Sequence, residues 1–521
     1  MDIILFVISM ALFTFVFTFL GYLGYKKTKT AEDYYVAGRK MGPIVIAFSY
    51  GATFISAVAL IGFSGIASIY GHSLLWLAFL NIFVGILIAF IFYGFRTRKM
   101  GLSLKAVTLP ELFGNRFNSK KFQAVSGLII AIFMIVYTTA VFLAISSLFV
   151  VTFGIPYWVC VVLFTLIVGI YLIVGGLYAV MWTHAIQGIV MLIGMLILTV
   201  GIYWMLGGIE PAHEAAAALT SNQLIDMGWT SVPAGFTTLT SMPETFSPTF
   251  MLLLTLIFGV GIGVLAQPQL IIRYLSAKDE RSLRRAIPYG GIFILLMTFF
   301  AFSIGPLCNV LMIRNGLNYP GTPDQVVPLI VNELFPPWFV ILFLFAVLSA
   351  AMSTASALFH TAGASIGRDV CEKGIMKKCS EKKSLLITRI ATLVIIIATL
   401  VISLNPPDVV AVLTSFFFGL MACTFLAPYT LMLYWKKTSR VGAWIGMMGG
   451  FIFTMFWYCL IYFKTAPQLI GNSISNNYLV NMLDPIFIGI PLSFILTFVF
   501  SILIKQDNNE IKSMKKAFEN I

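Results

Sequence analysis

Charged residues are scarce in this chain, making up 10% of its 521 residues, whereas hydrophobic residues make up 60%. Soluble domains carry about a quarter charged residues, so a water-soluble globular protein is excluded. The sequence has neither a phosphate-binding loop of the GxxxxGKS/T type nor an HExxH motif. An ATP-driven pump needs the first of these, and no catalytic set can be assembled for a membrane-embedded enzyme. We therefore predict that the protein is not an enzyme.

Two further absences narrow the class. The six cysteines show no metal-ligand spacing, so the sequence predicts no zinc or iron–sulfur site. The first hydrophobic stretch opens with Met1 and Asp2 and has no basic segment before it. It is therefore predicted to be a retained membrane span rather than a cleaved signal peptide.

Long hydrophobic runs dominate what is present. A helix needs roughly 20 mostly apolar residues to cross the hydrocarbon core of a bilayer, and a helix satisfies its own backbone hydrogen bonds in lipid. Thirteen such runs predict an all-α membrane protein of about 13 transmembrane helices. They lie near residues 3–25, 43–70, 74–95, 122–150, 156–178, 183–206, 249–274, 287–313, 336–365, 385–404, 408–435, 441–463 and 484–504.

The net charge of +13 raises the question of a nucleic-acid partner. If the N-terminus is outside and the spans alternate, 31 of the 33 Lys and Arg residues fall on the cytoplasmic side, and the exceptions are Arg314 and Lys464. The positive-inside rule requires this asymmetry. We therefore predict a multi-pass protein of the cell membrane, surrounded by the lipid bilayer, with no nucleic-acid partner. Residues 506–521 are expected to form a short cytoplasmic tail.

Two of the spans are interrupted by small or helix-breaking residues. The second reads FSYGATFISAVALIGFSG and the seventh reads FGVGIGVLAQPQ. Each opens a block of five spans, about 43–206 and about 249–435, within a single transporter domain of residues 1–505. Such paired breaks free backbone carbonyls at the bilayer midplane and indicate a transporter binding site. Close packing of helices through small residues is the alternative interpretation.

The ninth span contains the stretch AAMST, residues 350–354. Helical spacing brings the hydroxyls of Ser353 and Thr354 and the carbonyl of Ala350 onto one face. Sodium is a hard cation that prefers oxygen ligands, and two carbonyls from the broken second span would complete a cage without formal charge. The alternative is that both hydroxyls bond back to the carbonyl four residues earlier and bind no ion.

The chain resembles the sodium:solute symporter family, which includes bacterial symporters for proline, pantothenate, sialic acid and galactose. The resemblance covers nearly the whole length. It rests on segments in the family's order, which read AEDYYVAGRKMGP, SYGATFIS, VGGLYAVMWTHAIQ, QPQLIIRYLSAKD, AAMSTASA and YWKKTSRVGAWIGMMGG. This resemblance implies a LeuT-type fold of two inverted five-helix repeats, spans 2–6 and 7–11, which transports by alternating access.

The resemblance also implies a sodium site. Carried over by motif, it comprises the backbone carbonyls of Ala52, Ile55 and Ala350 and the hydroxyls of Ser353 and Thr354. Sodium is therefore the expected coupling ion.

His184 and Ala357 depart from the family pattern. Many members carry an Asp at the position of His184, and those that use a second sodium have hydroxyls near Ser356 and Ala357. An imidazole is a poor substitute for a carboxylate, so we expect one coupling sodium. A proton or second-cation role for His184 and Ser356 stays open because histidine titrates near neutral pH, and a buried structural histidine is the alternative. Phe54 stands where the proline symporter has an Asp.

The solute pocket is expected between the two broken spans. Ser56, Tyr137 and Gln267 are candidate polar contacts, and Val260 and Val264 would line an apolar wall; ordinary helix packing is the alternative for each. The proline symporter has aromatic residues at the two valine positions, which argues against proline. No charged residue is expected within the inner spans, so an anionic solute would depend on helix N-termini, hydroxyls and the bound sodium.

These observations predict a sodium-coupled secondary symporter that imports a small organic solute and functions as a monomer. A monocarboxylate or an amino acid suits the pocket better than a dianion. The alternatives are a solute sensor, or an uncoupled or proton-coupled carrier of the same fold.

Overall fold

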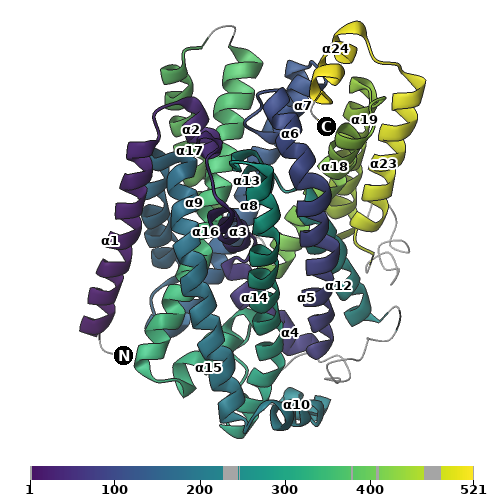
Figure 1. The fold of residues 1–521 in the computed structure, drawn as a ribbon. Helices are drawn as coiled ribbons and strands as arrows, with labels where there is room; N and C mark the ends of the chain where they lie inside the picture. The colour runs from purple at the N-terminus through teal and green to yellow at the C-terminus, as the bar shows by residue number, and fades with distance from the viewer. Residues whose placement is uncertain are drawn as a thin grey trace.

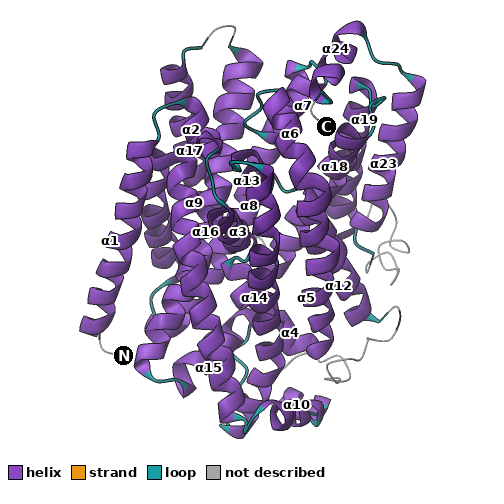
Figure 2. Ribbon diagram, in the orientation of Figure 1, coloured by secondary structure: helices purple, strands orange, loops and turns teal. Residues whose placement is uncertain are grey.

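The computed structural model describes residues 3–226, 245, 247–376, 379–405, 410–462, 483–519 and 521. Within these ranges the regular structure is helical, and the only pairing of extended backbone is an isolated bridge between Met41 and Ala277. Figure 2 shows long helices packed side by side. The C-terminus lies at the upper end of the molecule in Figure 1, and the chain starts near the lower end. The upper end also holds α2 (Ala31–Val36), α6 (Phe95–Ser103) and α7 (Leu109–Arg116). We call the upper end the basic end, because Lys26–Lys40 and Arg96–Lys121 lie there.

Each of the thirteen predicted spans coincides with helical structure, so the predicted all-α architecture is confirmed. In the described ranges, ten helices are long and apolar enough to cross a membrane, two bent pairs raise the number to 12, and a shorter apolar helix covers Tyr157–Gly169. The earlier helices are α1 (Ile3–Lys27), α3 (Pro43–Phe54), η2 (Val58–Phe63), α4 (Ser64–Tyr70), η3 (His72–Leu74), α5 (Leu75–Leu80), η4 (Asn81–Leu87), η5 (Ala89–Gly94), α6 (Phe95–Ser103), α8 (Lys120–Phe153) and α9 (Tyr157–Met205). The later helices are α12 (Pro248–Leu256), η6 (Ile257–Ile262), η7 (Gly263–Ala266), α13 (Pro268–Ser276), α14 (Glu280–Arg314), α16 (Pro337–Ala364), η9 (Ser365–Ile375), α17 (Glu381–Ser403), α18 (Val410–Tyr434), α19 (Arg440–Trp457), η10 (Tyr458–Tyr462) and α23 (Ile486–Leu503).

Both predicted breaks are present at the start of the two blocks. The axis bends by 55° between α3 and the helix that starts at Val58, and by 42° between the helix ending at Ala266 and α13. Pro268 is the first residue of α13. Because proline has no N–H to donate and fixes its own φ, it starts a helix readily but does not continue one.

The fifth and sixth spans are separated by a third break. They form one helical assignment, α9, in which Gly176 has a non-helical backbone with φ 58° and ψ −164°. Glycine adopts positive φ without the steric penalty that a Cβ imposes. The chain therefore turns at Gly176, a few residues earlier than the boundary expected from hydropathy.

Short helices cover both ends of the molecule. At the basic end they are α2 (Ala31–Val36), η1 (Ala37–Arg39), α7 (Leu109–Arg116) and α24 (Asn508–Ala517). The predicted tail therefore contains a helix, and α24 contacts α6 and α7. At the other end they are α10 (Ile209–Ala217), α11 (Ser221–Asp226), η8 (Pro323–Gln325) and α15 (Val326–Leu334). Residues 227–244 and 246 of the long loop lie outside the described residues.

Helix α16 lies at the centre of the bundle and positions the AAMST stretch. It contacts α3, α8, α9 and α17, and most of its residues are buried inside the protein. Every residue from Ala346 to Ala364 is buried. A helix buried on all sides must satisfy its polar side chains within the protein, so its serines and threonines indicate where the site lies.

Candidate functional site

The break after α3 leaves backbone carbonyls without a helical donor. The helix ends at Phe54, and Ile55 has an extended backbone with φ −81° and ψ 95°. The last carbonyls of a helix have no N–H partner one turn ahead. The hydroxyls of α16 take that place: Ser353 Oγ donates to the Ala52 carbonyl at 2.7 Å, and Thr354 Oγ1 donates to the Thr53 carbonyl at 3.1 Å.

These contacts bring together most of the residues expected to bind sodium. Ser353 Oγ also lies 3.0 Å from the Ala350 carbonyl, so the oxygens of Ala52, Ala350 and Ser353 meet at one point. Ile55 is the break residue itself, and it is buried like the other four. Thr354 bonds to Thr53 rather than to Ala52. A buried cluster of carbonyls and hydroxyls without a carboxylate can hold a monovalent hard cation.

His184 and Ser356 form a network beside this cluster. The His184 ring is fully buried, with Nε2 2.9 Å from Ser356 Oγ and Nδ1 3.1 Å from Thr53 Oγ1. Ser356 Oγ donates to the Ser353 carbonyl at 3.2 Å. His184, where the sequence departs from the family pattern, is therefore connected to the AAMST stretch through hydrogen bonds.

Arg273 corrects one expectation: the inner spans do contain a charged residue. It lies on α13 and is 0% exposed. Its Nη2 donates to Thr53 Oγ1 at 2.9 Å and lies 3.3 Å from His184 Nδ1. The apolar run that precedes Arg273 predicts a position on the cytoplasmic side for it. The signal that it belongs inside is the break at Pro268, since both halves of a broken span lie at membrane depth.

A small cavity lies on the other side of the α3 break. Three of the five predicted solute contacts line it, namely Ser56, Tyr137 and Val260, whereas Val264 and Gln267 do not. The Gln267 amide instead donates to the Gly263 carbonyl at 3.3 Å. The other lining residues, none of which was predicted as a solute contact, are Phe54, Ile55, Val58, Ala59, Phe63, Leu77, Thr298, Ala301, Phe302, Thr414 and Phe418.

This cavity is apolar and nearly closed. Its volume is about 20 Å³, which is roughly the space of one water molecule. The hydroxyls of Thr298 and Thr414 bond back to their own helices at 2.7 and 2.8 Å. The hydroxyls of Ser56 and Tyr137, whose oxygens lie 3.5 Å apart, are the groups that can hydrogen-bond to a solute. A solute therefore needs an apolar body, and the walls must move apart to admit it.

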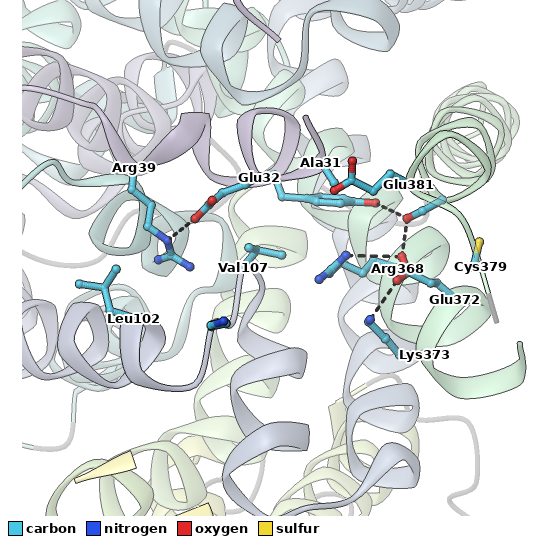
Figure 3. Close-up of a pocket in the computed structure, with 13 residues that line it drawn as sticks. Ala31, Glu32, Arg39, Leu102, Val107, Arg368, Glu372, Lys373, Cys379 and Glu381 are labelled. Atoms are coloured by element: carbon cyan, nitrogen blue, oxygen red, sulfur yellow. Dashed lines mark hydrogen bonds and ion pairs between the residues drawn. The ribbon is translucent and has the colours of Figure 1, made fainter. Parts of the chain in front are cut away.

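A second cavity, of about 620 Å³, opens at the basic end and is bordered by ion pairs. Figure 3 shows Arg39 facing Glu32, and Arg368 and Lys373 facing Glu372. Arg368 also donates two hydrogen bonds to Glu111, at 2.8 and 3.1 Å. Since Glu111 is on α7 and Arg368 on η9, this pair joins the two blocks at the basic end.

Comparison with known proteins places the chain among transporters. Residues 34–450 match the sequence profile of the sodium:solute symporter family. The osmoregulated proline transporter OpuE of Bacillus subtilis is 26% identical over 454 residues, which cover 87% of this chain and 88% of the relative. A sodium/proline symporter of Staphylococcus aureus is 28% identical over 506 residues, which cover 96% and 93%.

A solved structure shares the fold. It is the substrate-bound outward-open state of a Na⁺-coupled sialic acid symporter, with a TM-score of 0.74 at 18% identity, covering 94% of this chain and 96% of that chain. The predicted LeuT-type fold is thereby confirmed.

Proposed function

Because the chain belongs to the sodium:solute symporter family, we propose that it couples inward movement of sodium to import of a small organic solute by alternating access. The observation that carries this proposal is the contact between AAMST and the broken α3. Ser353 and Thr354 donate directly to the two carbonyls that the break frees. Sodium bound there would hold α3 and α16, which belong to different blocks, in a fixed relation.

The proposed sodium ligands are the carbonyls of Ala52, Ile55 and Ala350 and the hydroxyls of Ser353 and Thr354. The stoichiometry is proposed to be one sodium. Arg273 Nη2 lies 3.3 Å from His184 Nδ1, so a second cation at His184 would face a guanidinium within a few ångströms. Repulsion between like charges is strong in a buried site, and it opposes either a sodium ion or an added proton there.

The proposed solute is a monocarboxylate or an amino acid with an apolar body. The two named relatives are a proline transporter and a sodium/proline symporter. Proline itself is not proposed, because Val260 lines the cavity where the proline symporter has an aromatic ring. The cavity offers Ser56 and Tyr137 to a polar head group, and aliphatic and aromatic side chains to the remainder of the solute.

The basic end is proposed to face the cytoplasm of a cell whose plasma membrane the protein spans as a monomer. The distribution of Lys and Arg supports this orientation. The blocks of residues 43–206 and 249–435 would then be the two repeats that move against each other, with the breaks at Ile55 and Gln267 near the middle of the bilayer.

Uptake by proteoliposomes tests the coupling. Labelled candidate solutes, chosen by a thermal-shift screen of organic acids and amino acids with and without sodium, should accumulate only under an inward sodium gradient. Accumulation that is indifferent to the gradient would show an uncoupled carrier. Accumulation driven by a proton gradient alone would show proton coupling.

Substitutions test the sodium ligands. Ser353→Ala and Thr354→Ala each remove one ligand, so the sodium concentration for half-maximal stabilisation should rise about tenfold, which corresponds to about 1.4 kcal/mol of binding free energy. Thr399→Ala is the matched control, because the buried Thr399 hydroxyl bonds back to Ile395 in α17 at 2.9 Å. If both ligand variants bind sodium like the control, the assignment is wrong.

A further inference from the structure

Arg273 is a buried positive charge without a carboxylate partner. Its side chain is 0% exposed, and it takes part in none of the ion pairs of the described ranges. Its N–H groups donate to the hydroxyls of Ser49 at 3.3 Å and Thr53 at 2.9 Å, and to the carbonyl of Gln269. All of these acceptors are neutral.

His184 does not supply the missing negative charge. A guanidinium only donates hydrogen bonds, so His184 Nδ1, which lies 3.3 Å from Arg273 Nη2, is placed to accept. The ring proton then sits on Nε2, which donates to Ser356 Oγ at 2.9 Å. The imidazole is neutral in this arrangement, and the cluster keeps the full charge of Arg273.

The surroundings of Arg273 resemble a half-filled anion site. A buried charge without a counter-charge is strongly destabilising, so buried charges in proteins are usually paired or bind ions. The Tyr50 hydroxyl is buried, and the hydrogen-bonding group within its reach is the Tyr274 side chain, although the two do not meet in the geometry of an ordinary hydrogen bond. Its ring stacks on that of Tyr274 with centroids 5.9 Å apart, and Tyr50 is close enough to Arg273 to interact electrostatically.

We propose that Arg273, with the hydroxyls of Tyr50 and Thr53, binds a small monovalent anion such as chloride or formate. One negative charge neutralises the guanidinium, whereas a dianion would leave an uncompensated charge of the opposite sign. The cluster is wholly buried, so the anion must be small. This site goes beyond the symport activity, because it does not depend on which solute is carried.

The anion site is linked to the proposed sodium site through Thr53. The Thr53 hydroxyl accepts from Arg273, and the Thr53 carbonyl accepts from Thr354. A bound anion screens the charge of Arg273 and thereby reduces its repulsion of sodium at the neighbouring carbonyls. Sodium and the anion therefore bind cooperatively, and by linkage each raises the affinity of the other by the same factor.

Thermal unfolding of the purified protein tests both statements. Sodium is titrated as its chloride, formate or gluconate salt at matched ionic strength, and gluconate serves as the anion too large for the site. The half-saturating sodium concentration should be at least about fivefold lower with the small anions than with gluconate. Choline chloride and choline formate, compared with choline gluconate, should raise Tm without sodium. Equal behaviour of all three anions overturns the proposal.

The comparison of anions also shows whether the site prefers a halide or a carboxylate. Stabilisation by both chloride and formate supports a general site for small anions. A response to chloride alone identifies a halide site, and a response to formate alone identifies a site for a carboxylate. Each of these outcomes supports binding of a small monovalent anion to Arg273.

A matched pair of variants at His184 locates the effect. His184→Asp supplies a fixed carboxylate beside the guanidinium, so the sodium affinity should become independent of the anion. His184→Asn supplies a neutral side chain of similar size and should keep the dependence on the anion. An unchanged response in the His184→Asp variant overturns the proposal.

Failure of the sodium site can be told apart from failure of the anion site. If sodium does not stabilise the protein with any anion, the ligand assignment at AAMST fails. The comparison of the choline salts still decides whether Arg273 binds an anion, because no sodium is present in it.

Discussion

Gly176 occupies a backbone conformation that other residues avoid, with φ 58° and ψ −164°. A Cβ at this position would lie 2.8 Å from Cδ2 of Tyr34. Gly176→Ala is therefore expected to lower the free energy of unfolding by about 2 kcal/mol or more, from backbone strain and from the clash. The melting temperature of the purified protein measures this loss.

Gly291 provides the control for this substitution. It lies inside α14, where an added Cβ meets nothing within 4 Å. Gly291→Ala should leave stability unchanged or raise it by up to about 1 kcal/mol, since alanine is the better helix former. Equal melting temperatures of the two variants would contradict a special role for Gly176.

The buried Asp324, at the end of the molecule opposite the basic end, is expected to make the stability of the folded protein depend on pH. It is 7% exposed, and burial raises the pKa of its carboxyl to about 6, although the backbone of Val410 donates a hydrogen bond to it. The pKa of an unfolded Asp is about 3.9, so the folded state holds this proton more tightly. Stability from this group is therefore complete below about pH 4 and falls as the pH rises towards about 6.

Asp324→Asn should remove this pH dependence, in which the free energy of unfolding falls by about 3 kcal/mol between the pKa values of the unfolded and folded states. Melting temperatures at several pH values between about 4 and 7 measure it. Glu210→Gln changes an exposed acid on α10 and serves as the control. A wild-type slope that survives in Asp324→Asn would show that another group carries it.

At the level of single residues, a motif that names an oxygen predicts which groups lie together, and their role as sodium ligands stays a prediction. Ala52, Ala350 and Ser353 could be named because hydroxyl spacing and a family segment agree. Arg273 could not be placed, because hydropathy treats a charge at the end of an apolar run as a residue outside the membrane. Only the path of the chain after the break at Pro268 shows that this side chain turns inward.

At the level of elements, the spans could be predicted from their composition, and the short interfacial helices could not. Helices α2, α7 and α24 have 6, 8 and 10 residues. Segments this short carry little periodic signal, and they form because of local caps. One example is the reciprocal bond between Thr30 and Asp33 at the start of α2.

The ion pair between α7 and η9 is expected to hold the basic end closed. The Arg368 and Glu111 side chains are 14% and 5% exposed. Loss of one partner from a buried pair typically removes about 3–5 kcal/mol. Arg368→Gln should therefore increase hydrogen–deuterium exchange in Leu109–Arg116 at least about tenfold, because opening at the basic end becomes more frequent.

Lys99→Gln tests whether any ion pair at this end would have the same effect. Lys99 pairs with Glu280 at 3.2 Å, but their side chains are 33% and 42% exposed. An exposed pair contributes at most about 1 kcal/mol, so exchange in α7 should stay close to that of the wild type. An equal increase in both variants would contradict a specific role for Arg368.

At the level of the whole molecule, α24 packs against α6 and α7, which belong to the first block of residues 43–206. Glu510 accepts the N–H of Arg440 at 2.9 Å, and the Phe518 ring lies 5.8 Å from the guanidinium of the buried Arg116. Removal of residues 507–521 should lower the melting temperature while leaving the sodium affinity unchanged, since none of the proposed ligands is touched. Lys515→Gln, at an exposed position on α24, should change neither quantity.

The direct hydrogen bonds between α16 and the broken α3 bear on the return of the unloaded carrier. The Ala52 and Thr53 carbonyls accept hydrogen bonds from Ser353 and Thr354, so these two carbonyls are satisfied without an ion. Sodium at the proposed site would have to displace these bonds, and this cost would limit its affinity and let it leave again where the sodium concentration is low. The Ser353 and Thr354 hydroxyls, which are proposed sodium ligands, thus also satisfy the helix break in the empty protein and would allow it to reset and begin another cycle.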